Sequence, residues 1–225
     1  MTIQRLRGLS GRLRRDTSGL AMIEFGMMMP IFVVMCVGGS ELANYITTKM
    51  RMSQIALQIA DNAARLGTGS KLAAKTISET DINDVFAGAQ AESGTLKLKE
   101  NGRVILSSLE PIANPNPTNK YKIGWQRCYG TKTAHPSSWG VQGDIRDSMG
   151  PSNQPTKALL DNASMFVEVY YVYKPILPGI SSRFIPTTTP SEGVTLLETA
   201  SMALRDRRNL TDAPTRTTGD SKATC

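Results

Sequence analysis

The sequence has few of the side chains that usually carry enzyme chemistry. Its 225 residues include one histidine and three cysteines, and only 6% are aromatic. His135 alone cannot make a two-histidine metal site, and neither C-x-x-C nor H-E-x-x-H occurs. The glycines near Gly67 lack the lysine and the spacing of a phosphate-binding loop. We therefore expect no catalytic residue, no metal and no cofactor, although spacing alone does not exclude a dispersed Ser-His-Asp arrangement.

Positive charge is concentrated at the start of the chain. The formal net charge is +7, and residues 1–19 contribute +4 through five arginines and one aspartate. The remainder carries only +3, which removes the main support for nucleic-acid binding. Positive residues ahead of a first membrane span keep the N-terminus in the cytoplasm. The bulk of the chain should then be periplasmic or extracellular.

A long apolar run follows these basic residues. Leu20–Val37, LAMIEFGMMMPIFVVMCV, is about long enough for a membrane helix and contains one acid, Glu24. A charge at the centre of a membrane span costs about 3 kcal/mol, so a partner or a functional role is expected. Glu24 lies about one helical turn inside the basic flank, where it could instead snorkel to the interface or pair with a neighbouring arginine.

Other export signals fit this N-terminus less well. A twin-arginine signal needs apolar residues after its arginine pair, and residues 16–18 are polar. A lipoprotein signal needs a small residue before its cysteine, and Met35 precedes Cys36. A further alternative is an ordinary signal peptidase site after Gly39, with Val37 and Gly39 as its small residues, and it would release a soluble protein.

The residues around the acid carry a family resemblance. Gly19 closes the basic leader, Glu24 is the fifth residue counted from Leu20, and the aromatic Phe25 follows the acid. This pattern resembles the prepilin cleavage site of the Flp/Tad branch of the type IV pilin superfamily. With Pro30 inside the span and the late segments VEVYYVYKPIL and LLETASMALRDR, the chain resembles the TadE/TadG-like family of minor pilins and pseudopilins.

The resemblance implies a function and partners. The prepilin peptidase would cut between Gly19 and Leu20, and the apolar segment would stay as the N-terminal helix of the mature subunit. Glu24 and Phe25 would serve subunit assembly, because a carboxylate in lipid favours a cation such as the new α-amino group of an adjacent subunit. The implied partners are the bacterial inner membrane, the peptidase and other pilins and pseudopilins of the tight-adherence machinery, with no nucleic acid and no small-molecule substrate.

The implied protein is a single-pass subunit with a periplasmic C-terminal domain that acts in pilus assembly and surface adherence, in the membrane or in an extracellular pilus. A second hypothesis is a membrane-anchored periplasmic binding module with an uncleaved signal anchor. The mature N-terminus and the behaviour of a Glu24→Ala variant separate the two hypotheses.

The sequence predicts a pilin-like α+β fold with a long N-terminal helix, a short helix and an antiparallel sheet of about five strands. We divide it into a leader (1–19), a transmembrane segment (20–40), an amphipathic continuation of that helix (41–70) and a periplasmic domain (71–225). Apolar residues recur at helical spacing in the continuation: Leu42, Ile46, Met50, Ile55, Ile59, Ala63 and Leu66. A break at Gly38-Gly39 would instead give two separate helices.

The pattern after residue 70 predicts the other elements. Ser78 and Asp81 resemble a capping box for a helix over Glu79–Ala91. The predicted strands are 95–100 and 103–108, joined by an Asn101-Gly102 hairpin turn, then 121–129, a central strand at 165–174, and 194–204. For 194–204 a helix is the alternative. In the strand at 121–129, Tyr121, Ile123 and Trp125 should share one side. Residues 135–161 should form a long irregular loop.

Two features of the exported part leave alternatives open. Cys128 and Cys225 either form a disulfide, which would close a loop of about a hundred residues and contribute roughly 4 to 5 kcal/mol, or stay free thiols. The apolar but irregular segment Pro175–Pro186 either packs against the core or is exposed to a membrane or a partner subunit.

Overall fold

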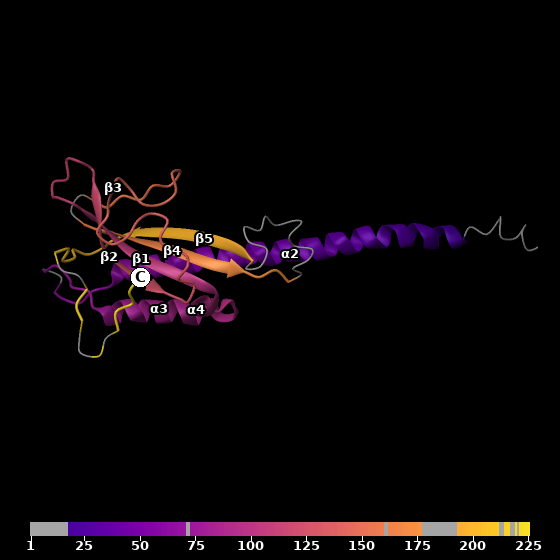
Figure 1. Ribbon diagram of the computed structural model, residues 1–225, viewed down its shortest axis with the longest axis horizontal. Coiled ribbons are helices and arrows are strands. Elements are labelled where there is room, and N and C mark those ends of the chain that lie inside the picture. The colour runs from indigo at the N-terminus through magenta and orange to yellow at the C-terminus, as the bar shows by residue number, and fades with distance from the viewer. Residues whose placement is uncertain are drawn as a thin grey trace, which may run out of the picture.

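One long helix projects from a domain of shorter helices and strands in the computed structural model (Figure 1). The described residues are 18–70, 73–159, 162–176, 193–211, 214–216, 219 and 221–225. A short helix and a five-stranded antiparallel sheet follow the long helix, so the predicted α+β fold is confirmed. Most of the leader and most of the apolar segment Pro175–Pro186 lie outside the described residues.

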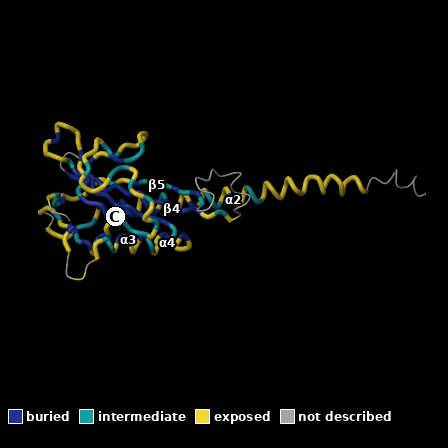
Figure 2. The backbone as a smooth tube through the Cα atoms, in the orientation of Figure 1, coloured by how far each residue is buried: buried dark blue, intermediate teal, exposed yellow. Residues whose placement is uncertain are grey.

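The long helix, α2 (Ser18–Arg65), continues without interruption past Pro30 and through Gly38-Gly39. Its 48 residues correspond to about 70 Å. The predicted continuous helix is confirmed, and the alternative of two separate helices is wrong. The N-terminal half of α2 is exposed, while much of its C-terminal half is buried against the domain (Figure 2).

The predicted apolar stripe on residues 41–66 is only partly correct. Ile55, Ile59 and Ala63 are buried against the sheet, but Leu42, Ile46 and Met50 are exposed. The reason is the five-residue step from Met50 to Ile55, which turns the next side chain by about 140° around the helix. The two groups of apolar residues therefore lie on different sides of α2.

The second helix, α3 (Glu79–Ser93), begins at the predicted position. Ser78 Oγ accepts from the Asp81 amide at 3.1 Å, and the Asp81 carboxylate accepts from the Ser78 amide at 3.0 Å, which completes the capping box. Ile82, Phe86 and their neighbours on the same side of α3 are buried in the core shared with α2. The predicted helix and its cap are confirmed.

The predicted hairpin at residues 95–108 is wrong because its first arm, 95–100, is not a strand, whereas the strand predicted at 103–108 is confirmed as part of the first strand. Residues Gly94–Leu96 form a 3-10 turn, η1, and Leu98–Asn101 form one helical turn, α4, before the first strand begins at Gly102. Leu96 and Leu98 are both buried in the core shared with α2. An extended strand would also place them on one face, so their alternation with polar residues did not distinguish a strand from these turns. Gly102 is required by packing, because a Cβ atom there would lie 2.7 Å from the Tyr170 carbonyl oxygen.

The sheet has the strand order β3-β2-β1-β4-β5. The strands are β1 (Gly102–Pro111), β2 (Tyr121–Tyr129), β3 (Ile145–Arg146), β4 (Ser164–Tyr173) and β5 (Val194–Ala203). The strands predicted at 121–129, 165–174 and 194–204 are confirmed, and β4 lies inside the sheet as expected. The short β3 falls within the segment predicted to be an irregular loop.

The two faces of the sheet have different coverings. One face packs against α2 and α3, and the larger core lies between these layers. A smaller core of Leu109, Tyr121, Ile123, Met149, Ala158 and Phe166 lies on the other face. Tyr121 and Ile123 belong to this smaller core, whereas Trp125 belongs to the larger one, so the prediction that they share one side is wrong. The register shift between Ser108 and Leu109, opposite Gly124, reverses the alternation.

Candidate functional site

The exposed N-terminal half of α2 is the main candidate for a functional surface. Its residues up to Met35 are exposed and almost all apolar, and the helix is long and apolar enough to cross a membrane. From Leu20 to Ser40 the helix measures about 30 Å, which matches the hydrocarbon thickness of a bilayer. This part of α2 extends away from the domain, so the domain leaves it free to contact lipid or another helix (Figure 2).

The predicted site residues lie together in the first two turns of this half. Gly19 and Leu20 belong to the first turn of α2, and Glu24 and Phe25 follow one turn later. Leu20 is 61% exposed and Phe25 is 65% exposed. Within the part of the chain that the structure describes, no side chain pairs with the Glu24 carboxylate.

Exposed apolar residues continue on the side of α2 that carries Glu24. At about 100° per residue, Glu24 and Leu42 are five full turns apart and therefore lie on the same side of the helix. Ile46, Met50 and Leu57 lie within about 80° of that line, and they are about half exposed. We call Leu42, Ile46, Met50 and Leu57 the outer stripe. It extends the apolar surface of the span onto the part of α2 that the domain holds.

A buried polar cluster fixes α2 to the sheet where the helix leaves the domain. Glu41 is 3% exposed, and its carboxylate accepts from the Tyr173 hydroxyl at 2.5 Å and from the Ile176 amide at 2.9 Å. Asn44 Nδ2 donates to the same hydroxyl at 2.8 Å. Burial, followed by the hydrogen bond to Glu41, raises the pKa of Tyr173 to about 12. Sequence analysis did not single out this cluster, because Glu41 and Tyr173 are 132 residues apart.

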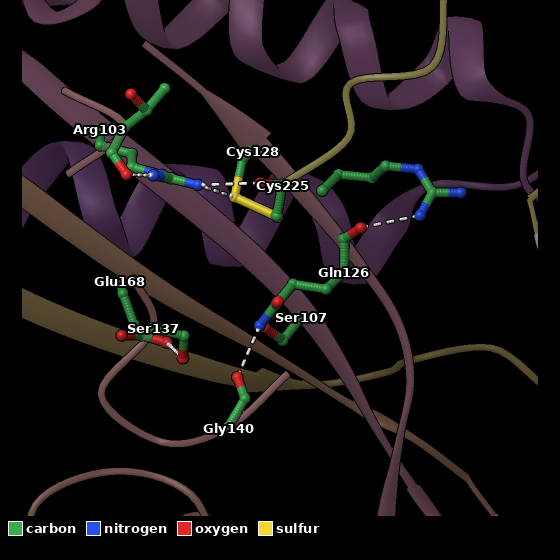
Figure 3. Close-up of a disulfide and its surroundings, with 10 residues drawn as sticks. Arg103, Ser107, Gln126, Cys128, Ser137, Gly140, Glu168 and Cys225 are labelled. Atoms are coloured by element: carbon green, nitrogen blue, oxygen red, sulfur yellow. Dashed lines mark hydrogen bonds between the residues drawn. A yellow bond between two sulfur atoms is a disulfide. The ribbon is translucent and has the colours of Figure 1, made fainter. Parts of the chain in front are cut away.

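Cys128 and Cys225 form a disulfide (Figure 3). Cys128 lies on β2, Cys225 lies at the end of the described chain, and 97 positions separate them. The Cys128 amide also donates to the Ala223 carbonyl at 2.9 Å. The disulfide therefore attaches the C-terminal segment to the sheet, and the alternative of two free thiols is wrong. Cys36 is a free and exposed cysteine of α2.

The buried charged groups of the domain make structural contacts. Glu79 and Arg127 form an ion pair in which both side chains are 1% exposed, and Arg127 Nε lies 2.8 Å from Glu79 Oε2. This pair joins the first turn of α3 to β2. His135 stacks on the Tyr170 ring with 5.3 Å between the ring centres. Among the described residues, no three His, Cys, Asp or Glu side chains are grouped so that they could hold a metal ion.

Glu168 of β4 is a fully buried acid on the sheet face that the helices leave uncovered. Ser137 Oγ donates to its carboxylate, and the Ser138 amide donates to it at 3.0 Å. Burial raises the pKa of Glu168 above its ordinary value, and the hydrogen bonds from Ser137, Ser138 and Tyr170 oppose that shift. Glu168 thereby holds the loop after β2 against the sheet.

Comparison with protein-family models, with curated proteins and with solved structures found no match for this chain.

Proposed function

We propose that this protein is a minor pilin or pseudopilin of the tight-adherence type, cut between Gly19 and Leu20 and assembled through α2. The observation that carries the proposal is the exposed half of α2, a bilayer-length apolar helix with one acid one turn after its start. The function is proposed from the resemblance of the N-terminal residues to a prepilin cleavage site. The exposed, continuous helix offers a surface through which such subunits would assemble.

The chemistry of Glu24 supports assembly between subunits. An ionised carboxylate at that depth is costly in lipid unless it meets a cation. Cleavage after Gly19 would create an α-amino group at Leu20, and the amine of an adjacent subunit could reach the carboxylate when the helices stack. The outer stripe would then continue the helix contact beyond the membrane, because it lies on the same side as Glu24.

The membrane orientation is part of the same proposal. The basic leader would stay in the cytoplasm and the domain would lie in the periplasm. The disulfide between Cys128 and Cys225 agrees with this location, because disulfides persist in oxidising compartments. Such a subunit would serve pilus assembly and surface adherence.

Cross-linking in the membrane tests the assembly step. A photo-reactive residue at Met28, one turn from Glu24 on the same side, should give cross-links to a second pilin subunit. Glu24→Ala should reduce the yield of these products about tenfold or more, because an ion pair in lipid is lost. The matched control is Glu92→Ala, which removes an exposed acid of α3 and should leave the yield unchanged. Equal yields from Glu24→Ala and the control would contradict the proposal.

The alternative is a membrane-anchored periplasmic binding module that keeps its leader. The observation in its favour is that the domain is complete around the C-terminal half of α2, with a core formed by one chain. This alternative predicts an uncut N-terminus and normal behaviour of the Glu24→Ala variant.

A further inference from the structure

A polar pocket of about 260 Å³ lies between α2, η1 and the end of β4. The side chains that line it include Asn44, Thr47, Thr48, Arg51, Thr95 and Lys174. Tyr173, the last residue of β4, also lines it and bonds Glu41 and Asn44 of α2. The pocket is therefore next to the junction where the exposed half of α2 leaves the domain, and Figure 1 shows β4 ending toward that half of the helix.

The pocket lies close to the depth of the lipid headgroups when residues 20–40 of α2 span a membrane. The headgroup layer extends about 5 to 8 Å beyond the hydrocarbon on each side of a bilayer. At 1.5 Å per residue, Asn44 is about 6 Å beyond the end of this span, and Arg51 is about 16 Å beyond it. Helical side chains lean toward the N-terminus of their helix, so the long side chain of Arg51 leans back toward the membrane.

Lys174 brings a second positive charge to this end of the domain. It lies between Tyr173 and Ile176 in the chain, and both of these residues bond the Glu41 carboxylate, one position after the span. Lys174 and Arg51 are exposed, and within the described part of the chain neither forms an ion pair. The pocket therefore places two unpaired cations beside the membrane surface.

The acids near the pocket bond other groups. Glu41 is buried, and its carboxylate accepts from the Tyr173 hydroxyl. Glu92 lines the adjoining pocket together with Arg51, but it accepts from Gln58 Nε2 and forms no ion pair with Arg51. No acidic side chain is among the described residues that line the pocket itself. The pocket is therefore positively charged.

Two cations and a hydroxyl from three elements suit a phosphate group. Arg51 comes from α2, Lys174 follows β4, and the exposed Thr95 belongs to η1. An arginine binds phosphate oxygens through two parallel hydrogen bonds, and a lysine binds them as a point charge. Basic residues at this depth attract anionic lipids, whose phosphates lie in the headgroup layer. Charge and position together favour a lipid phosphate as the occupant.

We propose that this pocket binds the phosphate headgroup of an anionic phospholipid in the membrane that α2 enters. Arg51 and Lys174 would hold the phosphate oxygens, Thr95 would donate a further hydrogen bond, and the acyl chains would lie along the exposed apolar half of α2. The bound lipid would hold the end of β4 against the membrane surface. The proposal rests on α2 entering a membrane, as in both functional hypotheses, but it requires neither cleavage after Gly19 nor assembly of subunits.

Native mass spectrometry of the full chain in a neutral detergent tests the proposal, with phosphatidylglycerol and phosphatidylcholine of identical acyl chains as probes. Both lipids offer the same chains to α2, but only phosphatidylglycerol has a net negative charge. It should bind at least about fivefold more tightly than phosphatidylcholine. Soluble glycerol 3-phosphate should bind at least about tenfold more weakly than phosphatidylglycerol, because it has no acyl chains to pack beside α2. Equal binding of the two lipids, or of phosphatidylglycerol and glycerol 3-phosphate, would overturn the proposal.

Two double variants assign the binding to this pocket. Arg51→Gln with Lys174→Gln changes two exposed residues and should weaken phosphatidylglycerol binding at least about tenfold, with Lys174→Gln alone losing severalfold. The control, Lys122→Gln with Lys157→Gln, removes the same charge from exposed positions near the opposite end of the sheet and should leave the affinity unchanged. Residues 1–19 are the same in every variant, so their attraction to anionic lipid cancels. Equal phosphatidylglycerol affinities of the two double variants would contradict the proposed site.

Discussion

The carboxylate of Glu41 on α2 accepts a hydrogen bond from the Tyr173 hydroxyl at the end of β4. Glu41 is the first residue after the exposed, bilayer-length part of the helix. This contact therefore joins the domain to its helix at the level where the helix leaves it. Because Asn44 bonds the same hydroxyl and Ile176 donates its amide to Glu41, the direction of the exposed helix relative to the sheet is set here.

Replacing Glu41 with glutamine should weaken this junction. Glu41→Gln removes a charged acceptor of two hydrogen bonds, and we expect the free energy of unfolding to fall by about 1 to 3 kcal/mol. The pKa of Tyr173, raised to about 12, should fall, because a hydrogen bond to Glu41 contributes to that shift. Denaturant unfolding and an ultraviolet titration of the tyrosines, with Tyr173→Phe to assign the signal, measure both effects. Glu24→Gln on the same helix is the control, and a matching effect there would contradict the role of Glu41.

Removing the disulfide should destabilise the domain. The bond closes a loop with a sequence separation of 97, for which the chain-entropy relation gives about 4 to 5 kcal/mol. The double variant Cys128→Ser with Cys225→Ser should lose stability of this order in denaturant unfolding. Cys36→Ser, on the exposed part of α2, should change the unfolding free energy by less than about 0.5 kcal/mol. A double variant as stable as the Cys36→Ser control would show that the bond does not constrain the unfolded chain.

Glu168 should make the domain less stable as the pH rises. Burial raises its pKa above the ordinary value of 4.5, so the folded state binds its proton more tightly than the unfolded state. The stabilising contribution of the protonated acid is present below pH 4.5 and is lost as the pH rises through the raised pKa. Glu168→Gln should therefore flatten the pH dependence of the unfolding free energy above pH 4.5. Burial also raises the pKa of Glu110, so Glu110→Gln shows how much of the slope comes from another acid. An unchanged slope in Glu168→Gln would contradict this assignment.

Local patterns predicted the elements whose causes are local. The periodicity and length of α2, the Ser78 cap of α3 and the β-branched and aromatic residues of β2, β4 and β5 were sufficient. The failures occurred where distant contacts decide the structure. Asn101-Gly102 has the composition of a hairpin turn, but Gly102 is there because β4 passes close to it and Leu98 is drawn into the core.

The residues of the candidate site also divide into those that a local pattern predicts and those that depend on distant contacts. Gly19, Leu20, Glu24 and Phe25 were found from their spacing, because four neighbouring positions carry the pattern. Glu41 and Arg127 were not found, because the meaning of each depends on partners far away in the chain. Burial was the missing information in both cases: an acid and an arginine that would ordinarily be solvated lie in the interior. No sequence pattern near either residue indicates that its side chain is buried.

The mature N-terminus tests the central proposal most directly. The intact mass and the N-terminal peptide should be measured on protein from cells with and without the prepilin peptidase. The proposal predicts a chain that begins at Leu20 when the peptidase is present and a chain that retains residues 1–19 when it is absent. A leader that stays attached in both cells, or a mature chain that begins at Ser40, would contradict the pilin assignment and support the anchored or released domain instead.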